Sequence, residues 1–349
     1  MSAVKRGYVR GLDLKEGRVD MSHGSGGRAM AQLIDELFAQ AFANDYLGQG
    51  DDGAVLPGAP GRLVMSTDCH VVSPLFFPGG DIGCLSVHGT INDVAMMGAT
   101  PLYLTAGFIL EEGFPLADLK RIIDSMARAS REAGVPVVAG DTKVVEQGHG
   151  DGVFITTTGL GLLPEGVNLS GSRARAGDRI LVSGSIGDHG MAIMAQRESL
   201  GFSSIIVSDT QALHGLVAAL LSSGAEVHAL RDPTRGGLAT TLNEIAQQSG
   251  VGMMLEEAAI PVNTEVAAAC ELLGLDPLYV ANEGKLVAII AANDAERALS
   301  VLAAHPQGAR AAIVGTVHED AHHFVQMITS FGGRRIVDWL TGEQLPRIC

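Results

Sequence analysis

Two runs of alternating strand and helix patterns, separated by one turn-rich segment, most constrain the fold of this 349-residue chain. The segment PEGVNLSGSRARAGD is rich in turn formers and charges and is typical of a linker. Before it, apolar strand-like runs such as RLVMSTD and LYLTAGFIL alternate with helix-like runs, and RILVSGSIGDHGMAIMA begins a second alternation after it. Each half could bury a core of its own, so we expect a two-domain α/β (α+β) fold.

We expect four parts along the chain. An N-terminal segment with a glycine-rich turn and a helix precedes two domains, and a flexible tail follows them. The expected boundaries are 1–47 for the segment, 48–163 and 164–340 for the two domains, and 341–349 for the tail.

The composition excludes several classes of protein. The formal charge is −15, from 24 basic and 39 acidic residues without a basic run, which argues against nucleic acid as a partner. No stretch approaches the roughly 20 apolar residues of a membrane span, and the first residues lack the apolar core of a signal peptide. Neither the four cysteines nor the histidines show the spacing of a metal site. We expect a cytoplasmic protein with reduced thiols and no membrane partner.

Aspartates at the ends of apolar strands or in turns form the most informative pattern. Such a carboxylate lies at a sheet edge, where ligand sites form, and several converging carboxylates repel one another unless a cation neutralises them. Mg²⁺ typically binds carboxylates together with substrate phosphates. A single aspartate is more often a helix cap or turn former, but the set favours a metal–phosphate site. Its members are Asp51, Asp52, Asp68, Asp93, Asp141 and Asp232.

Two glycine-rich turns that open helices are candidates for phosphate binding. HGSGGR contains Gly24, Gly26 and Gly27, and DPTRGGL adds Arg235. HGSGGR lacks the GK[ST] ending of a P-loop and does not follow a strand, so by itself it is equally compatible with an ordinary turn.

Lys143 and Glu283 are candidate catalytic residues. Lys143 follows Asp141 by two residues, so both side chains point to one side of an extended strand. A lysine beside carboxylates can contact phosphate or stabilise a developing anion, although a structural ion pair is a real competitor. Glu283 precedes a strongly apolar strand and could act as a general base, although its local sequence on its own favours a solvated turn.

The chain ends in LPRIC, which puts the thiol of Cys349 at the last position. Arg347 favours the thiolate and the terminal carboxylate opposes it, so the sequence does not fix the pKa of this thiol. A mobile arm with a terminal thiol can carry a covalently attached group between sites. An exposed thiol without a function is a liability, so the sequence favours a carrier over an inert thiol.

Taken together, the motifs resemble the HypE family of hydrogenase maturation factors, within the aminoimidazole-ribonucleotide-synthetase-like ATP-binding proteins. The aspartate motifs alone indicate only that superfamily, which includes selenophosphate synthetase and thiamine-phosphate kinase, and the terminal PRIC narrows the resemblance to HypE. The motifs are HGSGGR, DDGAV, STD, IND, AGDTKVV, SGSIGDHG, RDPTRGGL, ANEGK and PRIC.

The resemblance implies a homodimer in which the first domain pairs with its counterpart, and ATP with Mg²⁺ lies near this interface and between the two domains. The six aspartates are the implied metal residues. The implied ATP contacts are Gly24, Gly26, Gly27, Thr67, Asp68, Asn92, Asp93, Asp141 and Arg235.

The resemblance also implies a reaction on Cys349. The carbamoyltransferase HypF places a carbamoyl group on this thiol, and ATP-dependent dehydration converts the S-carbamoyl group to S-cyano, with Lys143 and Glu283 as the dehydration residues. A HypC–HypD scaffold then accepts the cyano group for the iron of [NiFe]-hydrogenase. The alternative is a superfamily kinase or synthetase that acts on a free small molecule, and that activity gives Cys349 no role.

Overall fold

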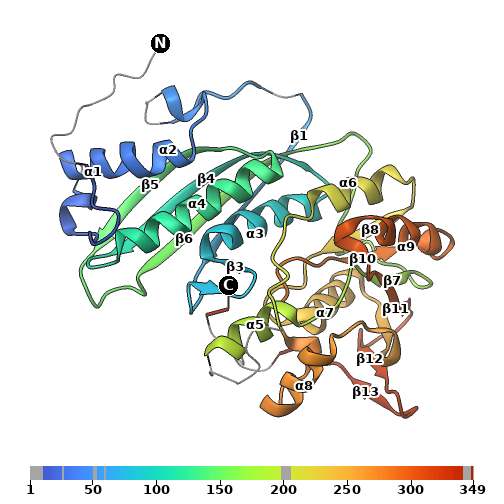
Figure 1. Ribbon diagram of the computed structural model, residues 1–349. Helices are drawn as coiled ribbons and strands as arrows, with labels where there is room; N and C mark the ends of the chain where they lie inside the picture. The colour runs from blue at the N-terminus through green and yellow to red at the C-terminus, as the bar shows by residue number, and fades with distance from the viewer. Residues whose placement is uncertain are drawn as a thin grey trace.

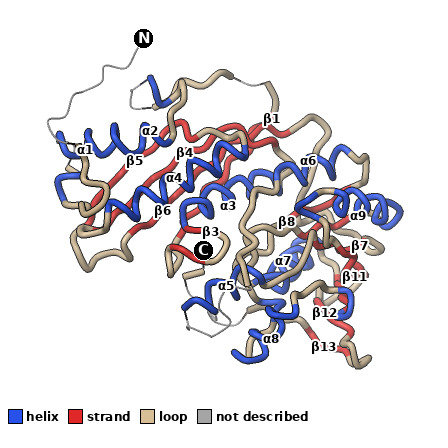
Figure 2. The backbone as a smooth tube through the Cα atoms, viewed as in Figure 1, coloured by secondary structure: helices blue, strands red, loops and turns tan. Residues whose placement is uncertain are grey.

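Two β-sheets, one in each half of the chain, lie side by side in the computed structural model (Figures 1 and 2). The structure describes residues 11–25, 27–49, 53–58, 60–197, 206–340 and 347–348. The two-domain α/β architecture expected from the sequence is confirmed. The boundaries expected at 47/48, 163/164 and 340/341 stay predictions.

The first half is built on a four-stranded sheet with the order β1-β6-β4-β5. Strand β4 pairs in parallel with β5 and antiparallel with β6, which pairs antiparallel with β1. The strands are β1 Arg62–His70, β4 Thr100–Glu111, β5 Val137–Val145 and β6 Val153–Leu163, with a separate short hairpin of β2 Phe76–Phe77 and β3 Gly80–Asp81. Strand β1 therefore runs two residues beyond Asp68, where the sequence predicts its end, because its pairing with β6 continues to His70.

Helices α3 (Ile82–Met96) and α4 (Leu116–Ala133) cover one face of this sheet (Figure 1). Asp81 caps α3 by accepting hydrogen bonds from the backbone of Gly83 and Cys84, and α4 ends at Gly134 in the left-handed conformation. The helix predicted after the glycine-rich turn also forms. It consists of α1 Arg28–Leu33, the π-helical η2 Ile34–Phe38 and α2 Ala39–Ala41. The separate 3₁₀ turns η1 Met21–Gly24 and η3 Leu47–Gln49 lie before and after it.

The second half contains a mixed seven-stranded sheet with the order β13-β12-β9-β11-β7-β10-β8. Its strands are β7 Arg179–Val182, β8 Val227–Arg231, β9 Gly252–Glu256, β10 Val287–Ile290, β11 Ala312–His318, β12 Val325–Ile328 and β13 Arg334–Ile336. Its helices are α5 Asp188–Arg197, α6 His214–Ser222, α7 Gly237–Ser249, α8 Thr264–Leu273 and α9 Ala295–Ala304, with 3₁₀ turns η4 Glu257–Ala259, η5 Pro277–Tyr279, η6 Ala292–Asp294 and η7 Pro306–Gly308.

Apolar side chains of this second sheet are buried on both of its faces. Ile180 and Val182 of β7 pack into the core formed with α7, and Leu181 between them packs into the core formed with α6 and α9. The latter core also includes Ala95 and Met96 of α3, so it continues across the seam between the halves. None of the helices in the described ranges is both long and apolar enough to cross a bilayer.

Glycines in β6 set how closely α3 approaches the first sheet. Gly159 and Gly161 alternate with leucines and face α3, where a Cβ atom added at Gly161 would lie 2.4 Å from Cγ1 of Val94. The opposite face of the sheet is different. Leu63, Met65 and Ile109 are 57%, 69% and 43% exposed there, and the helices of the first half lie on the other side (Figure 1).

We expect Gly161→Ala to lower the free energy of unfolding by about 1–3 kcal/mol, because the added methyl group overpacks the contact between β6 and α3. Gly107→Ala is the matched control, since a Cβ at Gly107 meets only the carbonyl oxygen of Thr156 at 3.9 Å. Urea unfolding of both variants measures the difference, and equal midpoints would contradict this account of the packing.

Candidate active site

An acidic cluster lies at the seam between the two halves. Asp68 belongs to β1, Asp93 to α3, and Asp232 directly follows β8. Asp93 and Asp232 line a cavity of about 450 Å³. The hydroxyl of Ser66 donates to Oδ2 of Asp93 at 2.8 Å, and Nε2 of His70 lies 3.3 Å from Oδ2 of Asp68. The fold thus brings together three of the aspartates singled out in the sequence.

Two aspartates of this cluster, Asp93 and Asp232, resist ionisation. Burial, together with the charges of Asp93 and Asp68, raises the pKa of Asp232 to about 7. Burial also raises the pKa of Asp93 to about 6, opposed by the hydrogen bond from Ser66 and reinforced by Asp68. A cation bound among these groups would relieve their mutual repulsion and favour the ionised forms.

The cluster fits a hydrated divalent cation better than a cage made only of protein ligands. Among the residues that the structure describes, no three acidic, histidine or cysteine side chains lie close enough together to hold a metal directly. Mg²⁺ usually keeps several of its waters and binds one or two carboxylates together with phosphate oxygens. Asp51 and Asp52, which the sequence adds to the metal residues, lie outside the described residues.

Asp141 and Lys143 do not join this cluster within one chain. The register pairs Asp141 with Gly107, Gly107 with Thr156, and Thr156 with Cys69, so Asp141 shares the face of Cys69 and not that of Asp68. The expectation of a single convergence is therefore corrected for Asp141, because it lies within β5 on the uncovered sheet face. There Nζ of Lys143 lies 3.2 Å from Oδ2 of Asp141, and the two side chains are 63% and 65% exposed.

Two of the expected ATP contacts are engaged with the protein itself. Thr67 points to the uncovered face, where its hydroxyl bonds to the hydroxyl of Thr158. Asn92 is buried in α3, and its side chain accepts a hydrogen bond from the backbone of Leu213 at 2.7 Å and donates to the carbonyl of Gln211 at 3.0 Å. The structure therefore gives Asn92 a joining role between α3 and the second half.

The glycine-rich turn packs against β5. A Cβ atom at Gly24 would lie 2.7 Å from the backbone nitrogen of Val144, so this glycine permits a close approach to the strand that carries Lys143. Gly27 is the residue before α1, Arg235 is exposed close to Asp93, and Gly26 lies outside the described residues.

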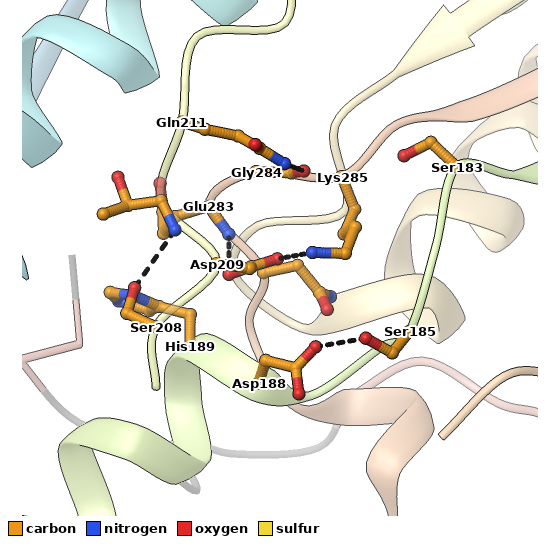
Figure 3. A network of polar contacts seen from close by, with 12 residues as sticks. Ser183, Ser185, Asp188, His189, Ser208, Asp209, Gln211, Glu283, Gly284 and Lys285 are labelled. Atoms are coloured by element: carbon orange, nitrogen blue, oxygen red, sulfur yellow. Dashed lines mark hydrogen bonds and ion pairs between the residues drawn. The ribbon is translucent and has the colours of Figure 1, made fainter. Parts of the chain in front are cut away.

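Glu283 is buried at the seam, with 3% of its surface exposed, so the solvated turn favoured by its local sequence is wrong. Its backbone nitrogen donates to Oδ1 of Asp209 at 3.1 Å, and Nζ of Lys285 lies 2.9 Å from Oδ2 of the same aspartate. Figure 3 shows Asp209 between the backbone of Glu283 and the side chain of Lys285. Both partners of this ion pair are almost fully buried, which fixes the position of the Glu283 backbone.

The last described residues of the chain are docked at the same seam. Ile348 is 3% exposed and belongs to the core of the first half. Its carbonyl oxygen lies 2.9 Å from Nε2 of His189 in α5. Of the tail expected at 341–349, only residues 347–348 are described, and these are docked; 341–346 and Cys349 lie outside the described residues, so the flexible tail stays a prediction.

His189, Asp209 and Lys285 were not among the candidates drawn from the sequence. Two of the family motifs contain a signal for them, because His189 lies in SGSIGDHG and Lys285 ends ANEGK. Asp209 has no such signal, since its segment resembles the start of a helix. The structure shows that segment as non-helical up to His214.

Comparison with known proteins decides the family. Residues 50–163 match the AIR synthase related protein N-terminal domain and residues 175–328 its C-terminal domain. The carbamoyl dehydratase HypE of Azotobacter vinelandii is 70% identical, over 97% of this chain and 99% of that protein. The chain belongs to the HypE family of carbamoyl dehydratases.

Two solved structures of HypE proteins resemble this one closely. A hydrogenase maturation protein HypE in complex with ATP is 51% identical with a TM-score of 0.91, over 95% of this chain and 99% of that one. HypE in a HypE–HypF complex is 50% identical with a TM-score of 0.78, over 88% of this chain and 99% of that one. This HypE-family chain is thus an enzyme with the fold of proteins solved with ATP and with HypF.

The raised pKa of Asp232 predicts how Asp232→Asn changes stability with pH in the absence of metal. The folded wild type holds this proton up to a pKa of about 7, compared with 3.8 ordinarily, so it loses stability relative to the variant as pH rises through this interval. Between pH 4.5 and 8 we expect the variant to gain at least about 1.4 kcal/mol relative to wild type, the equivalent of one pKa unit.

Urea unfolding in a chelating buffer measures this difference at each pH. Asp124→Asn, at a partly exposed position on α4, controls for the loss of one carboxylate. A difference between Asp232→Asn and wild type that stays constant across this pH range would contradict the assignment.

Proposed function

We propose that this protein uses ATP to dehydrate a carbamoyl group carried on the thiol of Cys349, converting it to a thiocyanate. The cyano group then becomes a ligand of the iron in [NiFe]-hydrogenase. The observation that carries the proposal is the docking of Arg347 and Ile348 at the seam that also holds the buried Glu283. The link between them supports the proposal, because His189 contacts Ser208 and the next residue, Asp209, binds the Glu283 backbone.

The balanced reaction removes the carbamoyl oxygen as phosphate. The carbonyl oxygen of the S-carbamoyl group attacks the γ-phosphorus of ATP, and ADP leaves, so the oxygen becomes part of a leaving group. The carbon–oxygen bond then breaks and releases phosphate, while the nitrogen loses both of its protons and forms the carbon–nitrogen triple bond. The products are the S-cyano group, ADP and phosphate.

Glu283 is the residue we assign to proton removal. A carboxylate held in a buried site is less solvated than one in water and accepts a proton more readily. Asp209 fixes the Glu283 backbone, so the carboxylate is presented from a rigid position. Asp68, Asp93 and Asp232 would hold the Mg²⁺ of MgATP partly through its bound waters, and the cation would neutralise charge on the phosphates. Arg235, whose charge acts on Asp93, would contact the phosphates.

Lys143 enters the reaction through a second copy of the chain in this proposal. The uncovered sheet face carries the apolar Leu63, Met65 and Ile109 together with Lys143, and such a face is typical of a subunit interface. We propose a homodimer formed through this face. The first sheet separates Lys143 from the acidic cluster of its own chain. In the dimer, Lys143 of one copy therefore stabilises phosphate charge in the site of the other copy.

Two protein partners complete the cycle. HypF is the proposed carbamoyl donor, supported by the solved HypE–HypF complex, and a HypC–HypD scaffold is the proposed acceptor of the cyano group. We assign the reaction to the cytoplasm, where thiols stay reduced, in keeping with the free Cys69, Cys84 and Cys270. The superfamily kinase or synthetase remains the alternative, and it needs no thiol at position 349.

Intact-protein mass spectrometry tests the proposal. Protein carbamoylated by HypF and then given MgATP should lose the mass of one water, and fragmentation should place the change at Cys349. Protein given ADP is the control and should keep the carbamoyl mass. Wild-type protein that keeps its carbamoyl group in MgATP would refute the dehydratase proposal.

Glu283→Gln and Lys143→Ala test the two assigned roles together. Each variant alone should lose at least about 100-fold in the rate of water loss, the size of effect typical of an acid–base or charge-stabilising group. Mixed dimers of the two variants should recover activity, because one of the two sites then contains both native residues. Absence of recovery in mixed dimers would contradict the sharing of Lys143 between copies.

A further inference from the structure

The C-terminal dipeptide Arg347–Ile348 is held through its main chain. The carbonyl oxygen of Arg347 accepts hydrogen bonds from the backbone nitrogen of Ser73 at 3.1 Å and from Nη2 of Arg197 at 3.0 Å. The next carbonyl, that of Ile348, lies 2.9 Å from Nε2 of His189. Both terminal carbonyls that precede Cys349 therefore have a specific donor.

His189 holds the tail as a neutral imidazole with its proton on Nε2. A carbonyl oxygen only accepts hydrogen bonds, so Nε2 carries the proton in the contact with Ile348. Burial lowers the pKa of His189, which keeps the ring neutral, and Nδ1 then accepts from the hydroxyl of Ser208 at 2.7 Å. The ring of Phe77 packs edge-on against the imidazole, with the two ring centroids 5.4 Å apart. Both ring nitrogens of His189 thus have a hydrogen-bond partner, which fixes the orientation of the imidazole.

Arg197 joins the tail to both halves of the molecule. Its guanidinium donates to the carbonyl oxygen of Ser73 through Nε at 3.1 Å and through Nη2 at 2.6 Å, and Nη2 also reaches the carbonyl of Arg347. Asp151 adds an ion pair of 3.3 Å to the Arg347 side chain. These contacts hold Arg347 in a left-handed conformation at φ 55°, which is costly for a residue other than glycine.

The contacts of the tail and of Glu283 come from one short segment of chain. Ser208 bonds to His189, and the next residue, Asp209, binds the backbone of Glu283. Gln211 then donates from its side chain to the carbonyl of Gly284 at 2.9 Å. Figure 3 shows the labelled side chains of this segment facing both His189 and the Glu283–Lys285 turn. The tail contact at His189 and the Glu283–Lys285 turn are therefore joined through this segment.

We propose that His189 and Arg197 are positioning residues that seat the last two residues before Cys349 and align the carried group with Glu283. We call His189, Arg197, Ser208 and the backbone of Ser73 the seat. The seat binds the main-chain carbonyls of the tail, so it accepts the tail whatever group the thiol carries. This inference rests on the proposed function, and it adds how the carrier is held during dehydration.

Arg197→Ala tests the seat, with Arg175→Ala as the matched control. Arg175 is a more exposed arginine of the second half that pairs with Glu226 at 3.7 Å, so it controls for the loss of one guanidinium and one polar contact. In Arg197→Ala we expect carboxypeptidase to release Ile348 at least about 10-fold faster than from wild type. We also expect single-turnover water loss in MgATP to slow by about 10- to 100-fold, the cost of misplacing a reacting group. HypF should load the variant at the wild-type rate.

His189→Phe provides a second reading, because phenylalanine keeps the contact with Phe77 but cannot donate to Ile348. It should show the same faster release of Ile348. Wild-type release and water loss in both variants would overturn the inference, as would equal changes in Arg175→Ala. The proposed function fails separately, if loaded wild-type protein loses no water. A variant that fails to fold is replaced by Ser208→Ala, which removes the support of the His189 ring and should speed Ile348 release.

Discussion

The segment Ser208–Leu213 is the constraint on which the arrangement of the two halves depends. It runs without helical structure between the two sheets, and its polar groups are tied on each side. Asn92 of α3 binds the backbone of Gln211 and Leu213, and Asp209 binds Glu283 and Lys285 of the second half. Because these groups are buried, leaving any of them without a partner would cost about 1–3 kcal/mol. The segment therefore holds the halves in one relative position and places Glu283.

The proposed chemistry depends on a rigid arrangement around Glu283 and on a cation bound at the acidic cluster. The buried Asp209–Lys285 pair contributes little net stability compared with an apolar pair, but it fixes the geometry of its neighbours. The acidic cluster does the opposite, since Asp93 and Asp232 repel each other until a cation or a proton arrives. A protein with a rigid Glu283 region and an acidic cluster that needs a cation can hold the carrier in place before MgATP binds. In the proposed homodimer, the two copies associate through the uncovered face of the first sheet.

The sequence predicted the architecture and part of the site. Physical reasons explain why the rest of the site was not predictable. Strong helical periodicity made α4 predictable, whereas α3 is buried on nearly all sides and was predictable as a long apolar run that stops near Gly98. Apolar runs also indicated the strands of the first half. The short strands β9, β12 and β13 carried too little pattern for prediction. Convergence of Asp68, Asp93 and Asp232 followed from their positions at the seam. The separation of Asp141 followed from strand register, which shifts side chains between faces with every residue. The burial of Glu283 and the docking of Ile348 depend on contacts between distant residues, which no local pattern contains.

The fate of the carbamoyl oxygen tests the central claim most directly. Protein carrying an ¹⁸O-labelled carbamoyl group on Cys349 is given unlabelled MgATP in unlabelled water, and the released phosphate is analysed by mass spectrometry. Dehydration through attack on the γ-phosphate predicts one ¹⁸O atom in each phosphate formed with a cyano group. Label that appears in water, with unlabelled phosphate, would contradict the account.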